Sequence, residues 1–264
     1  MGKGKPFLEV LSSAIHEDYR FPFLEIFAFL YALGTFVLAN FTMGMAFQNT
    51  TNEAVAFTVT TSLISGSLIV FIILVLKNVA YGLGSDLEKG IIQTYFSYPL
   101  KRSRILTARL ISAIGISLLL FLGIQISALY ILAPDIVLPQ FSTIILTYAA
   151  SLSYPLLISA IMLIMTLILR RGGIALVVGI VMYFAMSIVS GIAFAVSFAT
   201  ESPLAIQIIS IISPSFAVQQ YYVETFDFWT PAFSEIMLYI GVSYAVVASL
   251  FIIGYIYFSR RLNL

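Results

Sequence analysis

The chain has 264 residues, of which 61% are hydrophobic and only 9% are charged, and its mean hydropathy is +1.05. Water-soluble domains are about half apolar and about a quarter charged, so this composition excludes a soluble globular protein. The net charge of +1 is close to neutral, and the absence of cysteine excludes disulfides and cysteine metal sites.

The first twenty residues are expected to form a cytoplasmic helix that lies in the headgroup region of a membrane. A helix over residues 6–19 places Leu8, Leu11, Ile15 and Tyr19 on one face and polar side chains on the other. These residues include no apolar signal-peptide core, so no cleavable signal peptide is expected.

Six long apolar segments follow, and each has the roughly 20 residues that a helix needs to cross a bilayer. Helices are predicted for all six, because a chain in lipid must satisfy its backbone hydrogen bonds internally. The whole chain is interpreted as a single transmembrane domain over residues 1–264, all-α in fold class. The expected spans are 21–46, 55–79, 105–132, 143–169, 173–199 and 235–258.

The basic residues predict the orientation of these spans. Lysine and arginine lie before span one, between or at the edges of spans two and three, between spans four and five, and after span six. The other three connections carry acidic residues and contain no lysine or arginine. Under the positive-inside rule, this pattern predicts a multi-pass protein of the plasma membrane with both termini in the cytoplasm.

A polar cytoplasmic segment, residues 80–104, separates spans two and three. Ser85 and Glu88 have the spacing of a capping box, and Asp86 suits the first turn of a helix that starts there. Pro99 disfavours helix in the residue before it, so this helix is expected to end just ahead of the proline. The apolar face of the expected helix contains Leu87, Ile91, Ile92, Tyr95 and Phe96.

Small polar side chains within the spans allow two interpretations. Hydroxyls and small residues favour close helix packing in membranes, and the same side chains suit the lining of a transport pathway. Gln125 and Asn40 are expected to form hydrogen bonds between helices. The polar set of span two is Thr58, Thr61, Ser62 and Ser65, and that of span five includes Tyr183 and Ser187.

The last outer connection, residues 200–234, is long. Within it the apolar segment 204–212 is too short to span and is expected to be re-entrant or interfacial. Aromatic residues after it are expected to anchor the outer interface. These expected anchors are Tyr221, Tyr222, Phe226, Phe228 and Trp229.

The first outer connection contains a glycosylation sequon that begins at Asn49. The sequon matters only in a host with the glycosylation machinery.

The cytoplasmic segment carries a family resemblance. Glu88-x-Gly90, the apolar-aromatic helix after it, Tyr98-Pro99-Leu100 and the basic residues that follow resemble the permease subunits of ABC-2-type transporters. The six-span plan of the chain also resembles that family. In such permeases a coupling helix between spans two and three contacts a separate ATPase. The resemblance implies ATPase contacts at Ser85, Asp86, Leu87, Glu88, Gly90, Ile91, Tyr95 and Pro99, and at the turn formed by Arg170 and Arg171.

The resemblance also implies the partners. Two permease copies, or one copy and a related chain, would form the pathway within the lipid, with spans one, two and five lining it. A pair of short re-entrant helices would close it on the outer side. Two copies of the ATPase would bind ATP and magnesium, since this chain has no phosphate-binding loop and is not expected to be an enzyme. No cofactor, metal or nucleic acid is expected on this chain.

Two other function classes remain open from the sequence. A six-span carrier or channel driven by an ion gradient is one, although such carriers usually keep ionisable residues near the membrane midplane. The only charge clearly inside an expected span is Glu25, close to the cytoplasmic edge. A membrane scaffold that transports nothing is the other. The substrate is not predicted.

Overall fold

The computed structural model describes residues 5–46, 51–96 and 100–260, with their side chains except those of residue 5 and residues 38–46. Every regular element in these ranges is a helix. Five helices are each long and apolar enough to cross a membrane. The pair α1 (Lys5–Asp18) and α2 (Phe23–Ala46), bent by 65°, brings the number to six if it counts as one span. The chain is therefore a helical multi-pass membrane protein, as its composition predicts.

The long helices begin and end within three residues of the predicted spans, with one exception. The second span was expected to end at residue 79, but its helix continues unbroken to Glu88. Two of the long helices contain π-helical stretches, labelled η1 and η2. The second span consists of α3 (Asn52–Val75), η1 (Leu76–Leu83) and α4 (Gly84–Glu88). The third consists of α6 (Arg102–Leu110), η2 (Ile111–Ile116) and α7 (Ser117–Leu132). The last three are the single helices α9 (Phe141–Leu169), α10 (Gly172–Thr200) and α13 (Phe233–Arg260).

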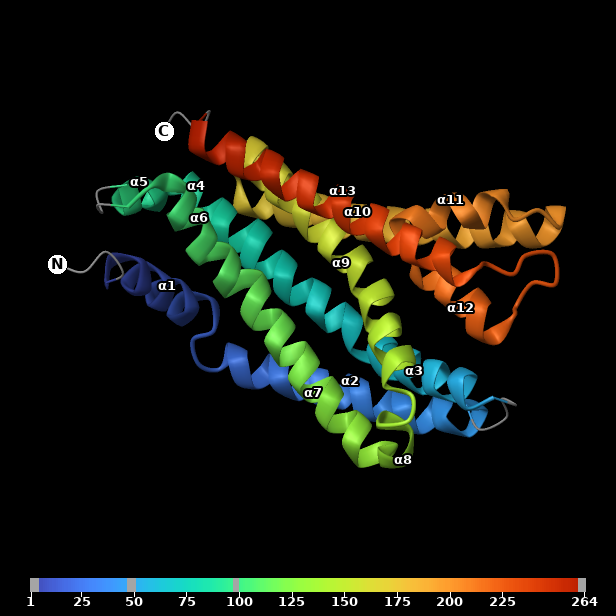
Figure 1. Ribbon diagram of the computed structural model, residues 1–264. Helices are drawn as coiled ribbons and strands as arrows, with labels where there is room; N and C mark the ends of the chain where they lie inside the picture. Colours follow the sequence, from blue (N-terminus) through green and yellow to red (C-terminus); the bar gives the residue numbers. More distant parts are fainter. Residues whose placement is uncertain (1–4, 47–50, 97–99, 261–264) are drawn as a thin grey trace.

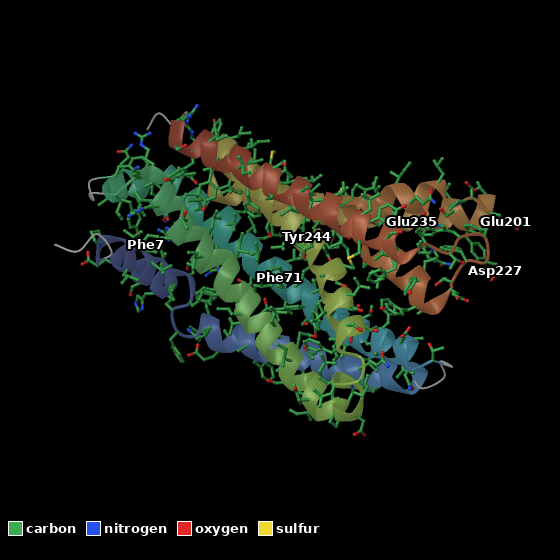
Figure 2. The ribbon with its side chains drawn as sticks, viewed as in Figure 1. Phe7, Phe71, Glu201, Asp227, Glu235 and Tyr244 are labelled. Carbon is green, nitrogen blue, oxygen red and sulfur yellow. The ribbon has the colours of Figure 1, made fainter. Side chains whose placement is uncertain are left out.

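Short helices lie at the two ends of the molecule (Figure 1). At one end, α1 and α5 (Ile91–Phe96) lie with α4, the start of α6 and the last turns of α13. At the other end lie α8 (Pro134–Val137), α11 (Leu204–Ile212) and α12 (Ser215–Val223). We call these the basic end and the acidic end, because the described lysines and arginines belong to elements of the first, to η1 next to it, or to the α1–α2, α4–α5, α5–α6 and α9–α10 connections. The acidic end carries Glu53, Asp135, Glu201, Glu224, Asp227 and Glu235, three of which are labelled in Figure 2.

The centre of the bundle is formed by α3 and α9. In the second span (Asn52–Glu88) and in α9, about 61% of an apolar 18-residue stretch is buried inside the bundle. In α10 and in α13, 17% of the corresponding stretch is buried. The outer helices consequently expose broad apolar surfaces, which suit contact with lipid or with another membrane helix. Phe71 of α3 lies in the main hydrophobic core with Tyr31 and Phe121 (Figure 2).

A buried polar junction joins four helices inside this core. The Gln125 amide nitrogen lies within hydrogen-bonding distance of three oxygens that share its two hydrogens: the Thr35 hydroxyl at 2.9 Å, the Leu63 carbonyl at 3.0 Å and the Ser67 hydroxyl. The Tyr148 hydroxyl donates to the Gln125 amide oxygen at 3.1 Å. The prediction that Gln125 bonds between helices is thus confirmed, and α2, α3, α7 and α9 are fixed in register. The Asn40 side chain lies outside the described side chains.

At the basic end, α1 packs against α6 and η2. Its buried residues are Val10, Ala14 and Asp18, which lie at four-residue spacing. The apolar face expected from the sequence is only partly used in this packing, because Leu8 is 61% exposed. This exposed face suits contact with a membrane surface, as expected for an interfacial helix.

At the acidic end, the predicted apolar segment is helical over α11, and α12 follows it directly. Gln220 of α12 holds the loop that leads to α13, since its amide nitrogen donates to the Phe226 and Trp229 carbonyls. Its amide oxygen accepts from the Phe226 amide at 3.0 Å. Phe226 and Trp229, two of the five predicted interface anchors, are buried in a cluster with Phe57 and so do not face the outer interface, whereas Tyr221, Tyr222 and Phe228 are partly exposed.

Candidate functional site

The expected capping box at Ser85 does not form. Ser85 lies inside the continuous helix Asn52–Glu88, and the residue before α4 has helical dihedral angles. The Ser85 carbonyl accepts a backbone hydrogen bond from Lys89. A helix start was predicted because serine and glutamate at this spacing favour one. The preceding residues instead stay helical through η1, where Leu76, Val79, Ala80 and Leu83 pack in the core.

Gly90 divides the expected coupling helix in two. Its φ of +71° is a left-handed conformation that favours glycine, and it ends one helix before α5 begins. The break changes which side chains face the core. Ile92 is fully buried, whereas Ile91, expected on the apolar face, is 37% exposed. Helix α5 is described as far as Phe96; the predicted stop before Pro99 falls on residues 97–99, outside the described residues.

The α9–α10 turn packs directly on α4. A Cβ atom on Gly172 would lie 2.5 Å from the Ser85 Oγ and 2.8 Å from the Tyr81 carbonyl oxygen, so the two helices meet backbone to backbone. The Gly172 amide also donates to the Glu88 carboxylate at 3.3 Å. Predicted site residues from two distant connections, Ser85 with Glu88 and the Arg170–Arg171 turn, are therefore neighbours.

Arg109 lies at the centre of a buried ionic cluster behind these residues. Its side chain is only 6% exposed, and its guanidinium pairs with Asp86 of α4 and with Glu17 of α1. The distance to the Glu17 carboxylate is 2.9 Å. The same guanidinium donates to the Tyr95 hydroxyl at 3.2 Å and lies over the Tyr95 ring. This cluster ties α1, α4, α5 and α6 into one unit.

Asp18 extends the cluster along α1. Its carboxylate accepts from the Ser112 hydroxyl at 2.5 Å, and its backbone carbonyl accepts from the Lys77 ammonium at 2.6 Å. Tyr19 beside it donates to the Ser112 carbonyl in η2 at 3.0 Å. Burial raises the pKa of the Asp18 carboxyl to about 6, and the Ser112 hydrogen bond and the Arg109 charge offset this only in part.

The sequence interpretation named Asp86 and Tyr95 but did not recognise this cluster. The available signal was Arg109 itself, an arginine placed inside a mostly apolar helix where an unpaired charge is costly. Such a residue requires acidic partners, and Glu17, Asp18 and Asp86 are among the acids near the same membrane edge.

The hydroxyl face of α3 lines a groove of about 310 Å³ near the acidic end. The groove contains Thr58, Thr61, Ser62 and Ser65 and is closed on its other side by Gln219 and Val223 of α12. The Ser62 and Ser65 hydroxyls donate to carbonyls one turn back at 2.7 and 2.8 Å, which leaves their oxygen lone pairs as acceptors.

Tyr183 and Ser187 do not belong to this groove. They lie on α10, where the Ser187 hydroxyl donates to the Tyr183 carbonyl at 2.9 Å and the Tyr154 hydroxyl donates to the same carbonyl at 3.2 Å. Ser187 is exposed on the outer surface of the bundle. Within one chain, the structure therefore does not bring the two predicted lining sets together.

In the part of the chain that the structure describes, no group of three histidine, cysteine or acidic side chains could hold a metal ion. Comparisons of this chain with protein-family models, with curated proteins and with solved structures found no match.

Proposed function

We propose that this chain is the membrane-spanning subunit of an ABC-2-type exporter, and that a separate ATPase docks on its basic end. Two copies of the chain, or one copy with a related chain, form the pathway, and two copies of the ATPase bind ATP and magnesium. Movement of α4 and α5 on ATP binding is passed to the spans. The proposal rests first on the residues around Glu88 and Gly90 that resemble such permeases.

One structural observation carries the proposal furthest. The two connections expected to meet the ATPase are joined by the Gly172–Glu88 hydrogen bond and by the backbone contact of α4 with α10. Glu88, Lys89, Gln93 and Arg171 remain exposed around this contact, so they form one polar surface from two connections. A partner that pushes on this surface would move the second and fifth spans together, because α4 continues α3 and the turn begins α10.

The buried charges favour this function over an ion-driven carrier. Among the described residues, the buried charged side chains are Asp18, Asp86 and Arg109, and all three belong to the ionic cluster at the basic end. An ion-coupled carrier usually keeps such groups near the membrane midplane. If no ion gradient drives transport, the energy must come from another subunit. In this proposal, ATP hydrolysis by an ATPase bound at the basic end supplies it.

The proposed orientation can be tested with single cysteines, since the chain has none of its own. Gln93, on α5, and Asp227 are both exposed and lie at the basic end and the acidic end, respectively. In intact cells, D227C should react with an impermeant thiol reagent, whereas Q93C should react only after the membrane is opened. Labelling of Q93C from outside would contradict the cytoplasmic assignment of the basic end.

Glu88 is the residue that tests the coupling function. The exposed Glu88 carboxylate accepts a hydrogen bond from the Gly172 amide at the start of α10, and Glu88→Ala removes this acceptor. The loss of such a helix cap costs about 1 kcal/mol, so expression and folding should persist. We expect weaker ATPase association, or hydrolysis that substrate no longer stimulates, together with little transport. Hydrolysis and transport are measured on the same reconstituted complex.

Two further variants separate contact from structure. Glu88→Gln keeps an acceptor for the Gly172 amide but loses the charge, and Glu9→Gln removes an exposed carboxylate of α1 outside the proposed docking surface. If the Glu88 charge contacts the ATPase, Glu88→Gln should behave like Glu88→Ala, and Glu9→Gln should be close to wild type. Normal stimulation and transport in Glu88→Ala would show that this carboxylate does not couple the two subunits.

A further inference from the structure

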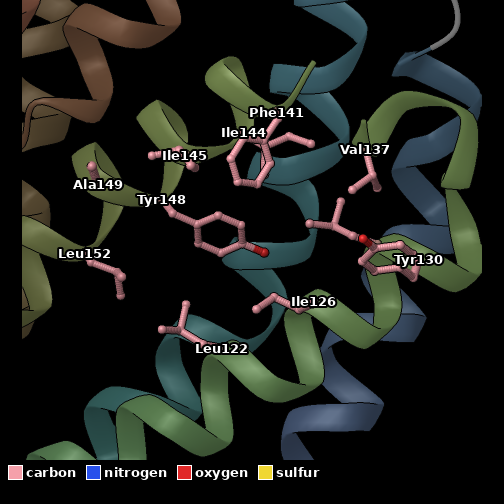
Figure 3. Close-up of a pocket in the computed structure, with 11 residues that line it drawn as sticks. Leu122, Ile126, Tyr130, Val137, Phe141, Ile144, Ile145, Tyr148, Ala149 and Leu152 are labelled. Atoms are coloured by element: carbon pink, nitrogen blue, oxygen red, sulfur yellow. The ribbon is translucent and has the colours of Figure 1, made fainter. Parts of the chain in front are cut away.

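An apolar groove of about 500 Å³ lies between α7 and α9, beneath α8 (Figure 3). Its wall from α7 includes Leu122 and Ile126, and its wall from α9 includes Ile145, Ala149 and Leu152. No charged side chain lines it. The lining contains two hydroxyl groups, those of Tyr130 and Tyr148, and the Tyr148 hydroxyl is already bonded to Gln125. The groove therefore suits an occupant that is hydrocarbon along its whole length.

The length of the groove matches one leaflet of a bilayer. Its lining on α9 runs from Phe141 to Leu152, which is about 16 Å at about 1.5 Å per residue. A hydrocarbon core about 30 Å thick gives each leaflet about 15 Å. The groove starts at the first turn of α9, beside α8, so it runs from the edge of the acidic end towards the middle of the bundle.

The groove is open towards the outside of the helix bundle. Ile126 and Ile145 on its two rims are each 51% exposed, and Phe141 at its mouth is 58% exposed. These side chains belong to two spans that are apolar enough to face hydrocarbon. Lipid chains can therefore enter from the side, without passing any polar barrier.

From these observations we propose that the groove binds one acyl chain of a membrane lipid from the leaflet at the acidic end. The bound chain lies along α7 and α9 and contacts the ring of Tyr148. Because the Tyr148 hydroxyl holds the Gln125 oxygen, an occupied groove also keeps Tyr148 in place at the junction of α2, α3, α7 and α9. Lipid binding then stabilises the bundle, as any ligand of the folded state does.

Fluorescence quenching tests this site directly. The purified full-length chain, in detergent and depleted of lipid, is titrated with phosphatidylcholine that carries brominated acyl chains. Ile145→Trp places a reporter in the groove, and Leu238→Trp places one on α13 at a residue that is 63% exposed but outside the groove. The native Trp229 is present in both variants, and its contribution is subtracted with wild-type protein.

The expected result is quenching of the groove tryptophan that saturates near one lipid per chain. The control tryptophan should be quenched only in proportion to the bulk lipid. Ala149→Phe, which fills the groove, should weaken saturable quenching at least tenfold, and Ala149→Leu should act in the same direction. Proportional quenching at both positions would overturn the proposal. Protection of the groove tryptophan at every lipid ratio would also overturn it, because protein would then cover the groove.

A second measurement needs no tryptophan variant. Unbrominated phosphatidylcholine should raise the thermal unfolding midpoint of the wild-type chain. The increase should be retained in Ala149→Ser, which does not fill the groove, and lost in Ala149→Leu. An equal increase in all three proteins would show that stabilisation comes from lipid elsewhere on the surface and would contradict the proposed site.

Discussion

Replacing Arg109 with leucine should lower the free energy of unfolding of the chain by about 3–5 kcal/mol, because it leaves buried acids without their counter-charge. Asp86 is 2% exposed and pairs with this guanidinium, and Glu17 and Tyr95 would lose their contacts as well. The thermal unfolding midpoint in detergent and the yield of intact chain measure this effect. No other substitution in the cluster should cost as much.

Two comparisons identify the cause of that loss. Arg104→Leu removes an exposed arginine from the same helix and should change the free energy of unfolding by less than about 0.5 kcal/mol. Adding Asp86→Asn to the Arg109→Leu chain should recover part of the loss, because the unpaired buried carboxylate accounts for much of it. An Arg109→Leu chain that unfolds at the wild-type temperature would mean that the cluster contributes little to stability.

Gly172→Ala should produce the second large effect. Its new Cβ would lie 2.5 Å from the Ser85 Oγ, 2.8 Å from the Tyr81 carbonyl oxygen and 2.9 Å from the Ser85 amide nitrogen. Two of these are backbone atoms that a rotamer change cannot move, so α10 must shift away from α4. Overpacking of this kind costs about 1–3 kcal/mol. In the proposed complex it should also weaken ATPase association, because it separates the two halves of the docking surface.

The neighbouring glycine is a close control for this prediction. A Cβ atom on Gly173 meets nothing within 4 Å, and alanine is the better helix former, so Gly173→Ala should be neutral or slightly stabilising. The unfolding midpoint and the fraction of chain recovered with the ATPase are compared in the two variants. Equal values for Gly172→Ala and Gly173→Ala would show that the close approach of α4 and α10 is not required.

Most of the fold could be predicted from the sequence. Apolar segments of span length and the positions of lysine and arginine indicate the helices, and the structure agrees closely at all but one end. The end of the second span at Glu88 was not predicted, because the spacing of Ser85 and Glu88 is a local signal that favours a new helix start at Ser85. Gly84 and Ser85 pack against Gly172, which is distant in sequence, and no local pattern shows this contact.

The candidate site was predictable only in part. Glu88, Gly90 and the Arg170–Arg171 turn were named from a motif and from loop charge, but nothing in the sequence placed the two connections in contact. The Arg109–Glu17 pair joins residues 92 positions apart. The acidic partners of Arg109 follow from the requirement that a buried arginine be paired, and no local sequence pattern identifies them. Similarly, the hydroxyl face of α3 was evident, whereas its partner surface on α12 depends on how the loop at the acidic end folds.

The central claim is that an ATPase docks on the basic end, and a photo-crosslinking measurement tests it most directly. A photoreactive phenylalanine analogue replaces Gln93, which is exposed on α5, and in a separate variant replaces Leu238 near the acidic end. After illumination of intact cells, mass spectrometry identifies the protein attached to each position. The account predicts an ATPase with a phosphate-binding loop attached at position 93 and not at position 238. Attachment of no ATPase at position 93, in cells where the chain is active in transport, would contradict it.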